Sequence, residues 1–215
     1  MRKIALIFSL AVGMLGSAAA TDAFAQKDKR AEAILDAMSK KYKAMPAYQA
    51  AFSYTAPGAK PYTGDLTVKD NKFRLKLAGQ DVYNDGKTMY TYIKESNEVN
   101  VQDYDNSATG DFNPARIYSI YKEGYNYKHL KEQKQGGRTV DVIELTPEKK
   151  NTQISKVQIN VDKADKSVRS WQITDKSGKV TNYTITSFTP NAKVADNYFV
   201  FDKSKFPGVE VVDLR

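Results

Sequence analysis

The sequence predicts a mostly β fold, in which one helix precedes a long series of antiparallel strands within a single domain. The chain of 215 residues is long enough for one domain with a substantial core. Apolar residues recur with a helical period only near residue 40, and with a period of two from there on. Short turn sequences separate the alternating segments, as in antiparallel hairpins.

The amino terminus has the pattern of a cleaved secretory signal. Met1 to Lys3 carries two positive charges, and residues 4–15 are almost entirely apolar. Ala23 and Ala25 place small side chains at positions −3 and −1 of a cut before Gln26. Because the apolar run is short for a membrane span, we favour a cleaved signal over a retained anchor helix.

We therefore expect residues 1–25 to be a cleaved signal peptide and residues 26–215 to be one periplasmic domain. The chain has no cysteine, which excludes disulfides, zinc–thiolate sites and a cysteine nucleophile. For the same reason the protein cannot itself be a diacylglyceryl lipoprotein. Its net charge of +8 suits anionic lipid headgroups or acidic protein surfaces, since nucleic acid is not expected in that compartment. Solubility alone is an equally good explanation of this charge.

An amphipathic helix is expected to open the domain. Its apolar positions recur at spacings of three and four residues, with Lys, Glu and Asp on the opposite side. Pro46 is expected to end it. The apolar face consists of Ala31, Ile34, Leu35, Met38, Tyr42 and Met45.

Alternating apolar and polar residues predict strands over most of the remaining chain. Asp70-Asn71 and the segment 84–87 are expected to be tight hairpin turns. Together the segments suggest about eleven strands in meander order, forming either a barrel or a strongly curved open sheet. The clearest strands are 48–55, 66–69, 73–77, 88–93, 98–104, 139–145, 154–161, 168–174, 180–188 and 209–212.

One segment interrupts the β pattern. Residues 103–113 are polar and acidic, and Asn113-Pro114 reads as an N-cap followed by proline in the first helical position. Ile117, Ile120 and Tyr121 then fall on one face of a short helix. A helix in the middle of a meander must lie over an end or a mouth of the sheet, as a lid would.

The sequence offers little catalytic chemistry. His129 is the sole histidine, in a strand rich in Tyr and Lys, and neither Ser119 nor Ser170 lies in a nucleophile elbow. Three acidic residues of one loop lack the Gly and Glu that a calcium loop needs at its sixth and twelfth positions. We therefore expect no enzyme, no cofactor and no metal site. The acidic residues of this loop are Asp103, Asp105 and Asp111.

Several short motifs, in order, resemble the LolA family of periplasmic lipoprotein carriers. The family pattern G-x-L-x-V is matched from Gly64 to Val68, and its F-R motif by Phe73-Arg74. The D-G-K turn is matched at Asp85 to Lys87, and the lid proline at Pro114. Near the carboxyl terminus, F-x-F and P-x-G-V are matched by residues 199–201 and 207–209.

The resemblance implies a curved antiparallel half-barrel of about eleven strands, with an N-terminal helix and a short lid helix over an apolar concave face. Its cargo would be acylated lipoproteins, received from an inner-membrane ABC transporter and passed to an outer-membrane acceptor. We expect a monomer. The resemblance places the acyl-chain cavity at Phe73, Leu75, Leu77 and Val82, closed on another side by Leu35 and Met38, with Pro114, Ile117, Ile120 and Tyr121 as the lid.

Asp70 departs from the family, which has an arginine at this position that is thought to hold the lid closed. An ionised Asp cannot donate the hydrogen bonds that an arginine donates. If the resemblance holds, the closed state depends on other contacts.

Three alternatives remain open at this stage. The named cavity residues are also what an ordinary core would contain, and Trp171 and Ile173 suit either face of the sheet. The same fold could serve as an acyl-chain-binding or envelope-sensing module. A secreted carbohydrate-binding or hydrolytic β protein would also be rich in tyrosine, of which this chain has fourteen, although tyrosine is a favoured strand residue in any case.

Overall fold

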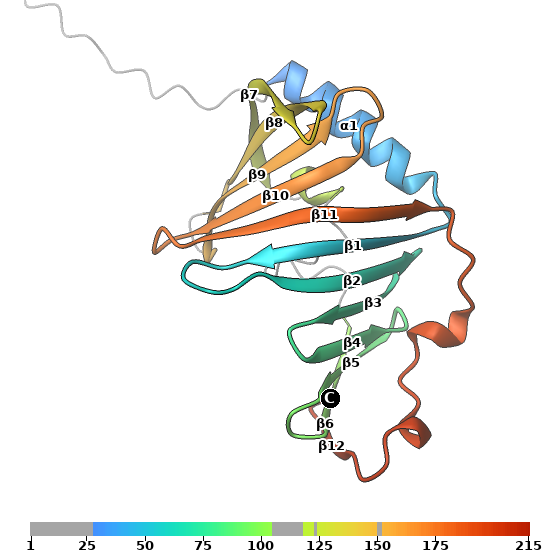
Figure 1. Cartoon of the computed structure of the whole chain (residues 1–215). Coiled ribbons are helices and arrows are strands. Elements are labelled where there is room, and N and C mark those ends of the chain that lie inside the picture. The colour runs from blue at the N-terminus through green and yellow to red at the C-terminus, as the bar shows by residue number, and fades with distance from the viewer. Residues whose placement is uncertain (1–27, 105–117, 123, 150–151) are drawn as a thin grey trace, which may run out of the picture.

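The computed structural model describes residues 28–104, 118–122, 124–149 and 152–215. Within these residues the chain forms one α-helix, α1 (Lys29–Lys43), and one sheet of twelve strands. The sheet is strongly curved and its two edges do not meet (Figure 1). Of the two arrangements expected from the sequence, the open curved sheet is the correct one, and the predicted mostly β half-barrel is confirmed.

The strands follow the order β12-β6-β5-β4-β3-β2-β1-β11-β10-β9-β8-β7 across the sheet. Two meanders, β1 to β6 and β7 to β11, are joined where β1 pairs with β11. The described residues also form three 3-10 turns: η2 (Ile120–Lys122), η3 (Asp196–Phe199) and η4 (Lys203–Lys205). The strands are β1 (Ala47–Thr55), β2 (Tyr62–Lys69), β3 (Lys72–Leu77), β4 (Gln80–Asn84), β5 (Thr88–Ile93), β6 (Glu98–Asp103), β7 (Tyr125–Gln135), β8 (Arg138–Pro147), β9 (Ile154–Asp162), β10 (Val168–Asp175), β11 (Val180–Pro190) and β12 (Glu210–Asp213).

The last strand differs from the sequence-based expectation in its direction. β12 pairs with β6 in parallel, with Val211 opposite Val99, whereas every other pair in the sheet is antiparallel. After β11 the chain passes through η3 and η4 before it reaches the edge of the sheet (Figure 1). This detour allows β12 to lie along β6 without a hairpin turn.

α1 begins at a side-chain cap and packs by its apolar face. The Asp28 carboxylate accepts hydrogen bonds from the backbone N–H groups of Arg30 (2.8 Å) and Ala31 (3.2 Å). The predicted apolar stripe is buried from Ala31 to Tyr42, and the helix ends at Lys43, two residues before Met45, which is partly buried. Its buried residues belong to the same apolar cluster as the inner faces of β8, β9 and β10.

The C-terminal segment covers the outer face of β4 and β5. The Phe201 ring lies 5.6 Å from the Tyr83 ring and 5.9 Å from the Tyr90 ring, and it stacks on Phe206 at 4.7 Å. The Arg74 guanidinium lies 4.2 Å from the Tyr83 ring centroid. Phe201, the second aromatic residue of the F-x-F motif, thus lies at the centre of a small outer core.

Gly64 on β2 lies under the Phe52 ring of β1. A Cβ at this position would lie 2.6 Å from Phe52 Cζ and 2.8 Å from the Lys76 carbonyl oxygen. We predict that Gly64→Ala lowers the free energy of unfolding by about 1–3 kcal/mol, the usual cost of overpacking. Urea denaturation would measure this. Combining it with Phe52→Leu should give a loss smaller than the sum of the two single losses, and strict additivity would contradict the proposed clash.

Asp162 ties the β9–β10 turn together from a buried position. Its carboxylate accepts hydrogen bonds from the N–H groups of Ala164 (2.9 Å) and Asp165 (3.2 Å) and from the guanidinium groups of Arg169 (3.0 Å) and Arg138 (3.2 Å). Burial alone would raise the pKa of Asp162, but these donors together lower it to about 2.

Because the folded pKa of Asp162 is depressed, its contribution to stability is present above the unfolded pKa of about 4 and is lost as the pH falls toward 2. We predict that Asp162→Asn lowers the free energy of unfolding by about 2 kcal/mol at neutral pH, and that the difference from wild type narrows below a pH of about 4. Urea denaturation across this range measures both. The exposed Asp65 provides the control, Asp65→Asn, which should change little. A pH-independent loss in Asp162→Asn would contradict the account.

Candidate functional site

The inner, concave face of the sheet is apolar across most of its width, but it is covered unevenly. Where α1 packs, on the inner side of β8 and β9, the aliphatic side chains are fully buried. We call this region the filled half. It includes Ile143, Leu145, Val157, Ile159 and Val161.

The inner face of β3, β4 and β5 is only partly buried, and we call it the open half. Leu75 and Leu77 of β3, Val82 of β4 and Met89 of β5 pack against the same core cluster but keep accessible surface. Strand register makes this wall continuous, since Leu75 lies opposite Leu66 on one side and Val82 on the other. The apolar surface therefore extends from the packed core to the exposed side of the half-barrel.

The structure brings the described residues of the predicted cavity into one cluster but divides them by exposure. Leu35 and Met38 of α1 are fully buried, and Phe73 of β3 is 5% exposed. These three side chains are ordinary core residues in this conformation. Leu75, Leu77 and Val82 have accessible surface, so an apolar ligand could reach them without moving α1.

The predicted lid lies partly outside the described residues. Pro114 and Ile117 are among the residues that are not described, whereas Ile120 and Tyr121 form η2, a 3-10 turn. The Tyr121 side chain is 3% exposed and belongs to the core cluster, and Ile120 packs against that cluster. The described end of the lid is therefore in contact with the apolar core.

A charged hydrogen bond holds η2 against α1. The Tyr121 hydroxyl donates to Asp36 Oδ1 over 2.5 Å, and Lys122 Nζ lies 3.4 Å from the same oxygen. Donation by Tyr121 lowers the pKa of Asp36, while burial, followed by the bond to Asp36, raises the pKa of Tyr121. Both shifts favour a neutral phenol that donates to an ionised carboxylate at neutral pH.

An aromatic cluster beside η2 was not anticipated from the sequence as part of the site. The Tyr118 ring stacks on Tyr42 of α1 at 5.7 Å, and Tyr42 also meets Tyr48 of β1 and Phe188 of β11. The Tyr42 hydroxyl accepts a hydrogen bond from the Val168 N–H over 3.1 Å, and burial raises the pKa of Tyr42 to about 12. Tyr42 lies on the apolar helix face expected from the sequence, and Tyr48 and Phe188 fall in expected strands, but Tyr118 was not singled out. The pairing of β1 with β11 brings Tyr48 and Phe188 together.

Trp171 and Ile173, which suited either face by sequence, lie with the inner side chains. Trp171 is 3% exposed within the core cluster, and Ile173 packs against it. The Trp171 ring stacks on the Tyr183 ring of β11 at 4.7 Å. A register shift between Val168 and Ser170 precedes this part of β10, and no local sequence pattern indicated it.

Asp70 lies in the two-residue turn between β2 and β3, with a positive φ of 54° and an exposed side chain. The neighbouring Lys69 and Lys72 both bind Asp196 of η3, at 3.0 Å and 3.1 Å. This turn is thus fastened to the C-terminal segment. No described contact joins Asp70 to the two described residues of the predicted lid, whereas Tyr121 is bonded to Asp36 of α1.

His129 and Ser170, which the sequence analysis considered as catalytic candidates, have structural partners. His129 Nε2 lies 2.9 Å from the Asp141 carboxylate, and both side chains are more than 90% buried. Arg30 at the start of α1 reaches the same carboxylate at 3.3 Å, so this network joins α1 to β7 and β8. Ser170 receives a hydrogen bond from Asn160. Asp105 and Asp111 lie outside the described residues.

The described part of the chain shows neither a metal-binding cluster nor a membrane-spanning helix. No group of three or more His, Cys, Asp or Glu residues there is arranged to hold a metal ion. None of the helices in those residues is long and apolar enough to cross a membrane. What the arrangement offers chemically is an aliphatic surface that is continuous with a core and bordered by a tethered segment.

Comparisons with known proteins agree with this architecture. The sequence model of the family described as "Outer membrane lipoprotein carrier protein LolA" matches residues 45–202, which run from the start of β1 to the end of η3 and beyond. None of the curated proteins compared with the chain matches it.

Among solved structures, an uncharacterized conserved protein from Thermus thermophilus is similar with a TM-score of 0.60 and 12% identity, covering 86% of this chain and 99% of that one. This likeness shows a shared fold. The LolA superfamily protein NE2245 from Nitrosomonas europaea has a TM-score of 0.43 and 14% identity, over 80% and 97% of the two chains. A chain of the Pseudomonas aeruginosa MucA/MucB complex has a TM-score of 0.48 and 16% identity, and the match covers 80% of this chain and 61% of that one.

The tether between η2 and α1 makes the accessibility of the inner face testable. Tyr121→Phe keeps the ring but removes a hydrogen bond worth about 1 kcal/mol, so η2 should separate from α1 more often. We expect an apolar fluorescent dye such as anilinonaphthalene sulfonate to bind up to about fivefold more tightly. Tyr90→Phe, on the outer face of β5, is the matched control. Unchanged dye affinity in a stably folded Tyr121→Phe protein would show that η2 does not restrict access.

Proposed function

Because the chain belongs to the LolA family of outer membrane lipoprotein carrier proteins, we propose that it shields the acyl chains of lipoproteins in its apolar concave face and carries them from the inner to the outer membrane. It would work as a monomer in the periplasm, after removal of residues 1–25 as a signal peptide. The observation that carries the proposal is the partly exposed aliphatic wall of Leu75, Leu77 and Val82, continuous with the core.

The energetics of acyl chains explain why such a surface is needed. Each CH₂ group transferred out of water contributes about 0.8 kcal/mol, so a lipoprotein anchored by several chains is held firmly in its membrane. A soluble carrier must therefore offer a comparable apolar surface that is not fully exposed when it is empty. The open half suits this role because its side chains are partly covered and still accessible.

The filled half would set the limit on how tightly cargo is held. Leu35 and Met38 are fully buried, so acyl chains could contact them only after α1 or its neighbours had moved. Enlarging the cavity in this way costs free energy. This cost lowers the net affinity for cargo and makes its release possible. We assign Phe73, Leu75, Leu77 and Val82 to the wall, and Leu35 and Met38 to the part that opens only with larger cargo.

The segment that begins at Pro114 and includes Ile117, Ile120 and Tyr121 would be the cover. The bond from Tyr121 to Asp36 supports this assignment, because it would supply the restraint that Asp70 cannot supply in place of the family arginine. Asp36 is about half exposed, so the bond is screened by solvent and weak enough to break during loading.

We further infer that the protein receives its cargo from an inner-membrane ABC transporter and delivers it to an outer-membrane acceptor, without a cofactor. No bond is made or broken in this process, so the protein acts as a carrier and not as an enzyme. Its excess of Lys and Arg would favour acidic surfaces on these partners.

A release assay tests the proposal. Inner-membrane vesicles that hold the transporter and a radiolabelled triacylated lipoprotein are incubated with the protein, and a soluble one-to-one complex is expected. Leu75→Glu should reduce release at least about tenfold, because a carboxylate on the wall must be desolvated against acyl chains. Lys76→Glu is the matched control, since Lys76 is the exposed neighbour on the opposite face of β3, and it should release cargo normally.

A cargo that lacks acyl chains should not be released. Equal release of acylated and non-acylated cargo would contradict the acyl-chain cavity. If acylated lipoprotein binds in detergent but is never released from vesicles by a folded protein, the carrier role is wrong, and the same face would serve an acyl-chain-binding or envelope-sensing module.

A further inference from the structure

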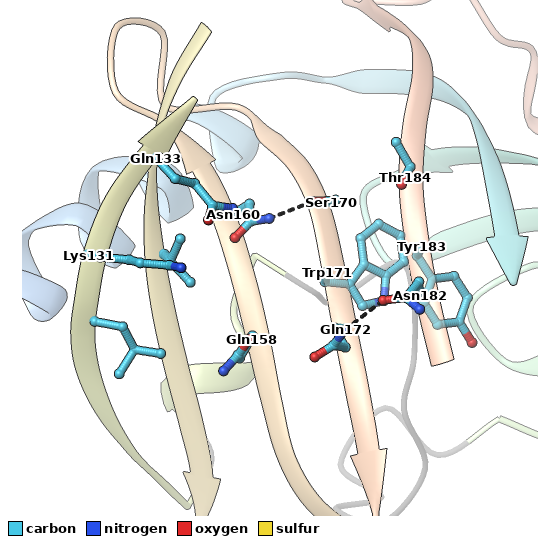
Figure 2. Close-up of a pocket in the computed structure, with 12 residues that line it drawn as sticks. Lys131, Gln133, Gln158, Asn160, Ser170, Trp171, Gln172, Asn182, Tyr183 and Thr184 are labelled. Carbon is cyan, nitrogen blue, oxygen red and sulfur yellow. Dashed lines mark hydrogen bonds between the residues drawn. The ribbon is translucent and has the colours of Figure 1, made fainter. Parts of the chain in front are cut away.

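The outer face of β7 to β11 carries a second concavity, on the side of the sheet opposite to the apolar wall. It is a groove of about 320 Å³ that spans these five strands (Figure 2). Its volume lies at the lower end of the range of about 300–1,000 Å³ that is usual for small-molecule sites. Its polar lining includes Gln133, Gln158, Asn160, Ser170, Gln172 and Asn182.

Strand register arranges these side chains in two rows that cross the strands. In one row Gln172 of β10 lies between Gln158 of β9 and Asn182 of β11. In the other row Ser170 lies between Asn160 and Thr184. Because neighbouring strands lie about 4.8 Å apart, each row presents a polar group at a regular interval across the groove.

Hydrogen bonds within the rows orient the amides and leave part of their capacity for a ligand. Gln172 Nε2 donates to Asn182 Oδ1 over 2.8 Å, and Asn160 Nδ2 donates to Ser170 Oγ over 2.8 Å (Figure 2). Each amide has one carbonyl oxygen and two N–H donors. The Gln172 and Asn160 carbonyl oxygens and an Asn182 N–H are not used by these two bonds.

Most of the side chains that line the groove are uncharged. Acidic and basic side chains make up 27% of the whole sequence. Among the described residues that line the groove, Lys131 alone is charged; it lies in line with the Asn160–Ser170 row and is separated from Asn160 by Val142 of β8. Beside the other row, Gln158 Nε2 donates to the Glu144 carboxylate over 3.0 Å.

We propose that this groove binds a neutral oligosaccharide that lies across the strands. A sugar hydroxyl both donates and accepts hydrogen bonds, and an amide side chain offers both partners. An anionic ligand would leave the amide oxygens facing negative charge. A peptide could not extend the sheet here, because β8, β9 and β10 are paired with neighbours along both edges.

This site is independent of the acyl-chain cavity because the two lie on opposite faces of the sheet. The inner side chains of β9 and β10 include Val157, Ile159 and Trp171, whereas Gln158, Asn160 and Gln172 alternate with them along the same strands. The protein could therefore bind a glycan of the envelope while its inner face is empty or loaded.

Isothermal titration of the full mature chain with two neutral tetrasaccharides tests the proposal. Tetra-N-acetylchitotetraose represents N-acetylated glycan strands, and cellotetraose represents glycans without N-acetyl groups. Comparing the affinities of the protein for the two sugars shows which class of glycan the groove binds. We expect one of them to bind, and Gln172→Ala combined with Asn182→Ala to weaken that binding at least tenfold. Gln49→Ala removes an exposed amide from β1, outside the groove, and should leave binding unchanged.

Absence of binding to both tetrasaccharides at millimolar concentration would overturn the proposal. So would equal weakening in Gln49→Ala, or tighter binding of a neutral Ser-Gly-Asn peptide than of either sugar. Leu75→Glu provides a second check, because the sugar affinity should be unchanged in this variant of the inner face. Loss of sugar binding in a folded Leu75→Glu protein would show that the sugar binds the inner face of the sheet, which would contradict the proposal.

Discussion

The apolar inner face of the sheet is wider than the helix that packs against it. Twelve strands about 4.8 Å apart extend over roughly 50 Å along the curve, whereas a helix of fifteen residues is only about 22 Å long. α1 can therefore cover β7 to β10 but not β3 to β5 as well. In a closed barrel, side chains of the strands opposite would fill the space over the inner face of β3 to β5. Because this sheet stays open, the inner side chains of β3 to β5 keep accessible surface, and the proposed acyl-chain site follows from this geometry.

The outer face is shaped by the same alternation of side chains. On β4 and β5 the outer residues are aromatic, and the C-terminal segment covers them through Phe201 and Phe206 before β12 pairs with β6. Within the groove, the outer residues of β9 to β11 are amides and hydroxyls, with no segment packed over them in the described structure. One sheet thus presents an aliphatic wall on its inner face and a neutral polar groove on its outer face, and a single strand such as β10 contributes to both regions.

Much of this could be predicted from the sequence because it depends on local periodicity. The helix, most strands, the hairpin turn at Asp70 and the apolar identity of the inner wall follow from spacing alone. The remainder depends on register and long-range pairing. The parallel pairing of β12, the inward position of Trp171 and the two amide rows all require knowledge of which strands are neighbours. Register shifts in β7, β9, β10 and β11 also change which residues share a face, and alternation counted along one strand does not reveal them.

The most direct test of the central claim is site-specific photo-crosslinking with an acylated lipoprotein as cargo. A benzophenone amino acid would replace Leu75 or Val82 on the inner wall, or Lys76 on the outer face of the same sheet. The account predicts crosslinks to the acyl chains from positions 75 and 82 and none from position 76. Crosslinks from position 76, or equal yields from all three positions, would contradict an acyl-chain site on the concave face.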